Sequence, residues 1–178
     1  MKREDIDLWS MDEVHFQQYG SRCRMWVPPE LKEPVLLHHP TRKSVGYFGA
    51  VRLRDGKFVY QREEKVFDGL SFFAFLKLVR QKSCHSGRRV ILLLDNAKYH
   101  HARLHKDWRA GCDDAFHCEY LPPYSPDLNP IERVWKLTRR LCIHNRYFPQ
   151  LSGIIDEVES QFDEWSTTSG DLHKLCVV

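Results

Sequence analysis

The stretch at residues 88–96, RRVILLLDN, decides the fold class. Its five consecutive apolar residues, Val90 to Leu94, are not interrupted by polar ones, a pattern typical of a strand buried on both faces by helices. The run is far too short to cross a membrane. It ends at Asp95, and the carboxyl ends of such strands are where α/β sheets bind their ligands. The sequence therefore predicts an α/β protein with Asp95 at the ligand-binding edge.

Patterns on both sides of this strand predict the remaining elements. Alternation and turn signals predict strands over 6–16 and 22–29, a hairpin over 43–63 and a short strand over 115–121. Apolar periodicity and capping signals predict helices over 70–79, 101–112 (closed by Gly111), 131–142 and 153–165. The order predicts one domain over residues 1–166, a mixed sheet flanked by helices, and a weakly structured C-terminal tail over 167–178.

A proline-rich stretch precedes one of these helices: residues 120–136 read YLPPYSPDLNPIERVWK. Proline fixes φ and removes a backbone donor, so we expect a rigid extended arm that aims Glu132. Asn129 is expected to be the N-cap of the helix and Pro130 its first residue. The helix is expected to bury Ile131, Val134, Trp135, Leu141 and Cys142.

Composition narrows the class of protein. The 178 residues carry a net charge of +3, which is compatible with a polyanionic partner without showing one. The six cysteines form no C-x-x-C pair, which favours reduced thiols. The first residues contain no apolar signal sequence. These features predict a globular protein of the cytoplasm, with no membrane association.

Three acidic residues occupy unusual positions: Asp12 in the first strand, Asp95 after the buried strand and Glu132 in the first turn of a helix. If the two strands are neighbours, the three carboxylates converge. Converging carboxylates repel one another unless a cation compensates, and hard oxygen ligands suit Mg²⁺ or Mn²⁺. Two such ions would activate a water and stabilise the leaving oxygen of a phosphodiester.

Structural roles would explain the same residues. Glu132 would complete a capping box with Asn129 and form an ion pair with Lys136. Asp95 would belong to a turn, and Asp12 would pair with an arginine. Spacing alone leaves these alternatives open.

Two motifs carry a family resemblance. The segments LLLDNAKYHHA (92–102) and YLPPYSPDLNPIERVWKLTRR (120–140), with MDEVHF (11–16) upstream, resemble the catalytic domain of DDE transposases of the mariner-like superfamily, in its bacterial insertion-sequence branch. The resemblance covers about residues 8–150. It implies a ribonuclease H-like fold with a five-stranded mixed sheet, and it matches Asp12, Asp95 and Glu132 to the family's catalytic, metal-binding triad.

The resemblance also implies an activity and partners. The expected reaction is Mg²⁺-dependent hydrolysis at transposon ends, followed by attack of the freed 3′-hydroxyl on target DNA. Members of this family usually carry helix-turn-helix domains before the catalytic domain, whereas only 11 residues precede Asp12 here. We therefore expect a catalytic half without that N-terminal domain, which would work with a separate helix-turn-helix subunit or as a homodimer.

Basic residues beside Glu132 are candidates for DNA binding. Arg133, Lys136, Arg139 and Arg140 would hold phosphates without reading sequence, or would form a solvated basic face. His100 would contact DNA or lie in the second shell of the metal, or have no role.

Other features carry weaker hypotheses. A structural zinc site is one hypothesis for His101 and His105, which are four residues apart, together with Cys112, His117 and Cys118. The spacing between these pairs matches no zinc motif, so histidines on a helix surface are the simpler interpretation. Trp26, Trp108 and Trp135 are expected to pack in or around the core. Two other functions remain open: a catalytically silent remnant that binds DNA or a partner subunit, and a nuclease for RNA–DNA hybrids.

Overall fold

A five-stranded mixed sheet forms the centre of the protein. The computed structural model describes residues 5–19, 21–31, 35, 37, 40–83, 87–123 and 125–177. The strands are β1 (Ile6–Gln17), β2 (Ser44–Arg52), β3 (Phe58–Glu63), β4 (Arg89–Leu94) and β5 (Phe116–Tyr120). Their order in the sheet is β3-β2-β1-β4-β5. β1 pairs antiparallel with β2 and parallel with β4, so the condition for the convergence of Asp12 and Asp95, that their two strands are neighbours, is met.

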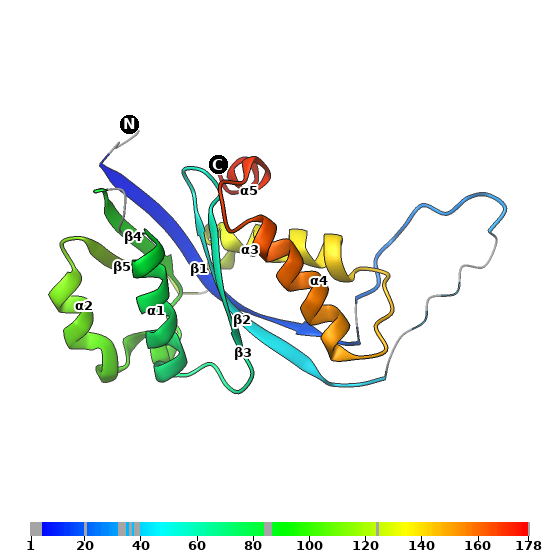
Figure 1. Cartoon of the computed structure of the whole chain (residues 1–178), viewed down its shortest axis with the longest axis horizontal. Coiled ribbons are helices and arrows are strands. Elements are labelled where there is room, and N and C mark those ends of the chain that lie inside the picture. The colour runs from blue at the N-terminus through cyan, green and yellow to red at the C-terminus, as the bar shows by residue number, and fades with distance from the viewer. Residues whose placement is uncertain are drawn as a thin grey trace.

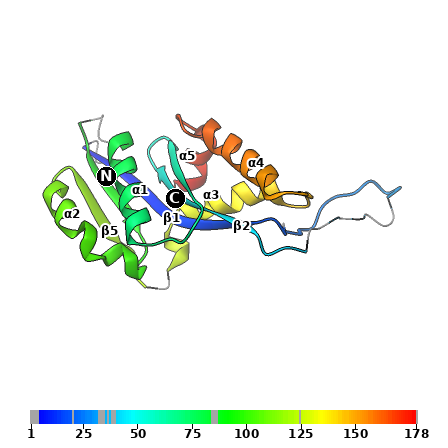
Figure 2. The same cartoon turned by 60° about the horizontal axis from the view of Figure 1, so that its bottom comes forward.

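Helices cover both faces of the sheet (Figures 1 and 2). The face that we call the α1 face carries α1 (Gly69–Ser83) and α2 (Lys106–Cys112), which pack on β1, β2, β4 and β5. The opposite face, which we call the α3 face, carries α3 (Ile131–Thr138), α4 (Leu151–Glu164) and α5 (Gly170–Cys176). Short helices complete the chain: η1 (Lys98–His101), η2 (Arg103–His105), η3 (Pro126–Leu128) and the π-helix η4 (Arg139–Ile143).

Local chemistry explains where the predicted elements begin. The β2–β3 hairpin turns at Gly56, whose φ of 72° suits glycine. α1 begins after Asp68, whose carboxylate accepts the backbone N–H groups of Leu70 and Ser71 at 2.8 and 2.9 Å. The predicted hairpin and central strand are confirmed, whereas the helix over 70–79 is buried on one face only: Phe72, Phe75, Leu76 and Val79 are buried and Leu70 is exposed.

Several predicted elements are different in the structure. Residues 22–29, all of which the structure describes, form no strand; Ser21 before them makes an isolated bridge to His144, and this segment extends away from the sheet (Figure 1). The predicted helix over 101–112 is divided: its first residues belong to the 3₁₀ turns η1 and η2, and α2 begins at Lys106. Gly111 lies inside α2 and does not end it. The tail contains α5, which packs on α3 with Leu172 and Cys176 buried.

The helix over 131–142 also differs from its prediction. It changes to a π-helix at Arg139, which rotates the following residues relative to α-helical spacing. Leu141 is consequently exposed, whereas Thr138 and Ile143 are buried. The proline arm is not extended throughout, because it contains η3.

Among the tryptophans, Trp135 is buried and Trp108 is partly buried against the α1-face core, but Trp26 is fully exposed. No disulfide joins the five cysteines among the described residues; Cys84 lies outside them. No helix in the described parts of the chain is long and apolar enough to span a membrane.

Candidate active site

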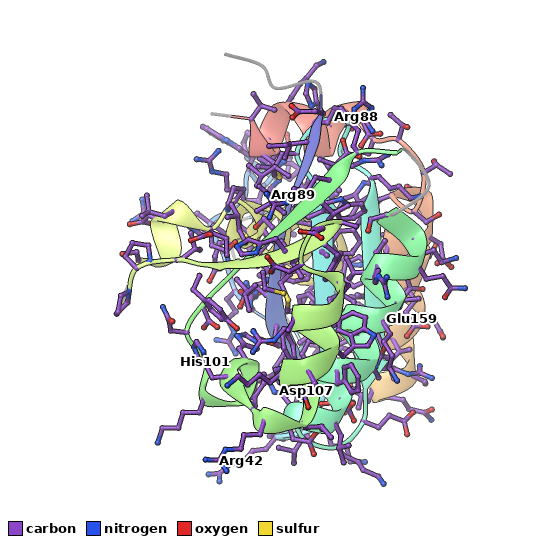
Figure 3. All side chains as sticks on the ribbon, turned by 90° about the vertical axis from the view of Figure 1, so that its left-hand side faces the viewer. Arg42, Arg88, Arg89, His101, Asp107 and Glu159 are labelled. Atoms are coloured by element: carbon purple, nitrogen blue, oxygen red, sulfur yellow. The ribbon has the colours of Figure 1, made fainter. Side chains whose placement is uncertain are left out.

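Asp12, Asp95 and Glu132 reach one cavity from three elements. Asp12 lies within β1, Asp95 directly follows β4, and Glu132 lies in the first turn of α3. In Figure 3, Arg88, just before β4, and Arg89, its first residue, are labelled in the upper part of the view, and His101, which follows the carboxyl end of that strand, is labelled in the lower part. The cavity has a volume of about 430 Å³. Its lining consists of Asp12, Asp95, Asn96, Ala97, Leu121, Pro122, Pro123, Ser125, Asn129 and Glu132.

Asp12 is oriented by a tryptophan on α3. The indole Nε1 of Trp135 donates a hydrogen bond to Oδ2 of Asp12 at 3.2 Å. Gly49 lies directly opposite Asp12 in the β1–β2 register, and a Cβ atom at Gly49 would collide with the Trp135 ring. Glycine at this position therefore makes room for the ring that holds Asp12.

The cavity disfavours negative charge at Asp12. Burial, together with the nearby Glu13 and Glu132 carboxylates, raises the pKa of Asp12 to about 7, although the hydrogen bond from Trp135 opposes this rise. A bound cation would offset both the burial and the repulsion. The oxygen-only donor set of the three acids fits Mg²⁺ or Mn²⁺.

Glu132 is positioned by a contact that its local sequence does not reveal. The Asn129 side chain does not cap α3; its Oδ1 accepts a hydrogen bond from the Ser10 hydroxyl, and its Nδ2 donates to the Met11 carbonyl at 3.1 Å. Ser10 Oγ also accepts the backbone N–H of Ile131 at 3.1 Å. The predicted capping box is therefore wrong, and these contacts, which we call the Ser10–Asn129 clasp, join the start of α3 to β1.

Asp95 is held from the other side by His100. The Nδ1 atom of His100 lies 2.9 Å from Oδ1 of Asp95, and Nε2 lies 2.9 Å from Oε1 of Glu13. Burial alone would lower the pKa of His100, but hydrogen bonds to Asp95 and Glu13 outweigh it and raise the pKa to about 9. The His100 hydrogen bond in turn lowers the pKa of Asp95 against the opposing effect of burial.

His100 is buried in this arrangement. Its side chain is 1% exposed; Nε2 faces the Glu13 carboxylate, and Nδ1 faces both the carboxylate and the main-chain carbonyl of Asp95, the latter at 3.1 Å. This burial favours the other interpretation of His100, a place behind Asp95, over a contact with DNA. Sequence reasoning missed Glu13; the available signal was strand alternation, which directs Asp12 and Glu13 to opposite faces.

The carboxylates form two groups of different compactness. Across the described residues, one group of three potential ligand side chains brings all its ligand atoms within 4.8 Å of one another: Glu13, Asp95 and His100. Asp12, Asp95 and Glu132 share the cavity but are more widely spaced.

The proposed zinc ligands do not come together. His105 is buried and contacts the Tyr99 carbonyl, His101 stacks on Tyr120, and His117 lies between Asp113 and Glu119. None of them belongs to the metal-competent group among the described residues, so the structure gives the zinc hypothesis no support.

The basic residues divide between different surfaces. Arg133 and Lys136 line a hollow of about 280 Å³ together with Glu132, although Arg133 also donates to the Leu175 carbonyl. Arg139 lies over the Phe16 ring in another hollow, and Arg140 lines a third one beside α4 and α5. Arg133 and Lys136 thus share a hollow with Glu132, whereas Arg139 and Arg140, which begin the π-helix, line two other hollows.

A five-stranded mixed sheet of order β3-β2-β1-β4-β5 between two helical layers is a ribonuclease H-like fold. Residues 7–155 match the family described as DDE superfamily endonuclease, and the chain belongs to this family. The five-stranded fold matches that of Mos1 transposase. The Mos1 strand transfer complex is 21% identical with a TM-score of 0.64, covering 95% of this chain and 50% of that one.

Two further solved structures agree. The Mos1 mariner paired-end complex with Mn is 17% identical with a TM-score of 0.66, covering 95% of this chain and 51% of that one. The Mos1 transposase catalytic domain with raltegravir and Mg is 16% identical with a TM-score of 0.57, and the match covers 96% of this chain and 78% of that one.

A sequence relative covers a shorter segment. The uncharacterized protein y4pE/y4sA of Sinorhizobium fredii is 34% identical over 74 residues, which are 42% of this chain and 51% of that protein. The chain thus spans about half the length of this relative and of the Mos1 chain in the strand transfer complex.

Proposed function

We propose that this chain is the catalytic domain of a transposase that hydrolyses DNA phosphodiester bonds at transposon ends and joins the freed 3′-hydroxyl to target DNA. The observation that carries the proposal is the convergence of Asp12, Asp95 and Glu132 on one cavity in a chain of the DDE endonuclease family. The bacterial insertion-sequence branch and an action on cytoplasmic DNA belong to the same proposal.

Asp12, Asp95 and Glu132 would hold Mg²⁺ or Mn²⁺, with two ions as the expected number. When bound, such ions supply an activated water or hydroxyl and stabilise the leaving oxygen. The chain's own residues fix the ligands: Trp135 orients Asp12, and the Ser10–Asn129 clasp sets the start of α3 and hence Glu132.

DNA is the proposed partner, and its phosphates would meet basic side chains around the cavity. Arg133 and Lys136 are the best placed, because they share a hollow with Glu132. Arg139 and Arg140 would contact more distant parts of the DNA. Recognition of transposon ends would come from a separate helix-turn-helix subunit, and pairing of two ends from a homodimer.

Nicking of supercoiled plasmid DNA with Mg²⁺ or Mn²⁺ tests the proposal. We expect metal-dependent nicking by the wild type and its loss in Asp95→Asn and Glu132→Gln. Asp113→Asn and Glu119→Gln are matched controls, because these carboxylates contact His117 on the surface and do not line the cavity.

Other outcomes would overturn the proposal. Nicking that persists in both triad variants would exclude the triad. A wild-type chain that neither nicks DNA nor binds Mn²⁺ would indicate a silent remnant. Preferential cleavage of RNA–DNA hybrids would indicate a ribonuclease instead.

A further inference from the structure

We propose that Glu13 is a positioning residue that fixes the orientation of the Asp95 carboxylate through the ring of His100. This inference rests on the proposed function, because it assumes that Asp95 binds the catalytic cation. Glu13 does not line the cavity, and its Oε1 faces the ring of His100.

A continuous chain of short contacts links the two carboxylates. Glu13 Oε1 lies 2.9 Å from His100 Nε2, and His100 Nδ1 lies 2.9 Å from Asp95 Oδ1. The Glu13 side chain is 10% exposed and that of His100 1%, so water competes little for these contacts. Hydrogen bonds to charged groups are stronger than neutral ones, and a low local dielectric strengthens them further.

The middle of this chain is held rigidly. The His100 ring packs against Phe72, with ring centroids 4.3 Å apart, and against Tyr99, at 4.6 Å. Its backbone N–H donates to the Ala97 carbonyl at 2.9 Å. The Nδ1 atom lies 2.9 Å from Oδ1 of Asp95 and 3.1 Å from the main-chain carbonyl oxygen of the same residue, so the fixed ring is tied to both the side chain and the backbone of Asp95.

The contacts at Asp95 select one of its two oxygens. Oδ1 accepts the backbone N–H of Ala97 at 3.0 Å and also faces His100 Nδ1. With Oδ1 engaged in both contacts, Oδ2 is the atom that would bind a cation. A bidentate or rotated arrangement of Asp95 would require breaking both contacts.

Strand alternation explains how β1 serves both carboxylates. Asp12 points to the α3 face, where Trp135 holds it, and Glu13 points to the opposite face, where His100 lies. Asp7 shows what a purely structural carboxylate on β1 looks like: it is fully buried and pairs with Arg52 and Arg54. Glu13 is paired with the histidine that contacts Asp95.

Mn²⁺ binding in the absence of DNA, measured by isothermal titration calorimetry on the full chain, tests the inference. We expect Glu13→Ala to weaken Mn²⁺ binding about 10- to 100-fold, the range for loss of partners behind metal ligands. Glu13→Gln keeps an acceptor oxygen for His100 Nε2 and should bind Mn²⁺ more tightly than Glu13→Ala. Glu119→Ala is the matched control, since Glu119 contacts His117 at 3.2 Å away from the cavity.

Thermal unfolding of the same variants shows whether each is folded at the temperature of the titration, so that weaker Mn²⁺ binding can be told apart from a loss of stability. Two results would overturn this inference and leave the proposed function standing. Either the wild type binds Mn²⁺ and Glu13→Ala binds it equally well, or Glu13→Gln binds Mn²⁺ no more tightly than Glu13→Ala. If the wild type binds no Mn²⁺, and Asp95→Asn changes nothing, the proposed function fails and the inference fails with it.

Discussion

The two faces of β1 hold the proposed catalytic carboxylates by different means. On the α3 face, Asp12 and Glu132 are positioned by neutral groups: the Trp135 indole and the Ser10–Asn129 clasp. On the α1 face, Asp95 is positioned by the charged contacts of His100 and Glu13. On the α3 face, the positions of the carboxylates therefore depend on the packing of the core around neutral hydrogen bonds. On the α1 face, the position of the Asp95 carboxylate depends on a few ionisable groups.

This difference predicts separable effects. Changes on the α3 face should reduce stability together with site geometry, because the same residues build the core. Changes to Glu13 should affect Asp95 and cation binding first. The following variants break or sharpen that comparison.

Gly49→Ala should have the largest effect on stability. The new Cβ would collide with the Trp135 ring, which fills the space opposite Asp12. We expect a loss of about 3 kcal/mol or more in the free energy of unfolding. Urea denaturation measures it, and Gly111→Ala is the control because a Cβ there meets nothing within 4 Å. Equal stability of the two variants would refute the tight packing of Trp135.

Ser10→Ala should be the next most damaging. It leaves Asn129 Oδ1 and the Ile131 N–H without their buried partner, which costs about 1–3 kcal/mol. Nicking should also decrease, because Glu132 lies one residue after Ile131. The exposed Ser160→Ala in α4 is the control. A stable, fully active Ser10→Ala would show that the clasp does not position α3.

Asp12→Asn should change how stability depends on pH. Because the pKa of Asp12 is raised in the folded state, folding favours the protonated form, and stability should fall as pH rises from about 4 to about 7. The contribution is up to about 1.4 kcal/mol per pH unit. In the presence of EDTA, the free energy of unfolding of Asp12→Asn should change less with pH over this range than that of the wild type. Parallel profiles would contradict the raised pKa of Asp12 in the folded protein.

The smallest expected effect is a change in the labelling rates of buried cysteines, which compares the two faces of the sheet directly. Burial raises the pKa of Cys118, Cys142 and Cys176 to about 11, so these thiols should react slowly at pH 8, whereas exposed Cys23 reacts at once. In a Cys84→Ser background, Gly49→Ala should accelerate labelling of Cys142 and Cys176, which lie on the α3 face, more than that of Cys118. Equal acceleration would show that both faces open as one unit.

The sequence predicts the features that depend on local patterns. The apolar run before Asp95 indicates the central strand, and the turn at Gly56 indicates the hairpin. The family resemblance picks out Asp12, Asp95 and Glu132, which the structure brings to one cavity. Their roles as catalytic and metal-binding residues remain predictions.

The contacts that orient these residues could not be read from the sequence. Asn129 has the local signature of a helix cap, but its partner Ser10 lies 119 positions away. Glu13 becomes informative only when β1 is known to place it opposite His100. Leu141 is exposed because a π-helix interrupts the expected periodicity, and α5 is seven residues long and depends on packing against α3.

The most direct test of the account is where Mn²⁺ binds. Crystals of the chain grown with Mn²⁺ should show anomalous density in the cavity, coordinated by Asp12, Asp95 through Oδ2, and Glu132, with His100 still in contact with Oδ1. Mn²⁺ bound between Glu13 and His100, or bound away from all three acids, would contradict the assignment of the site.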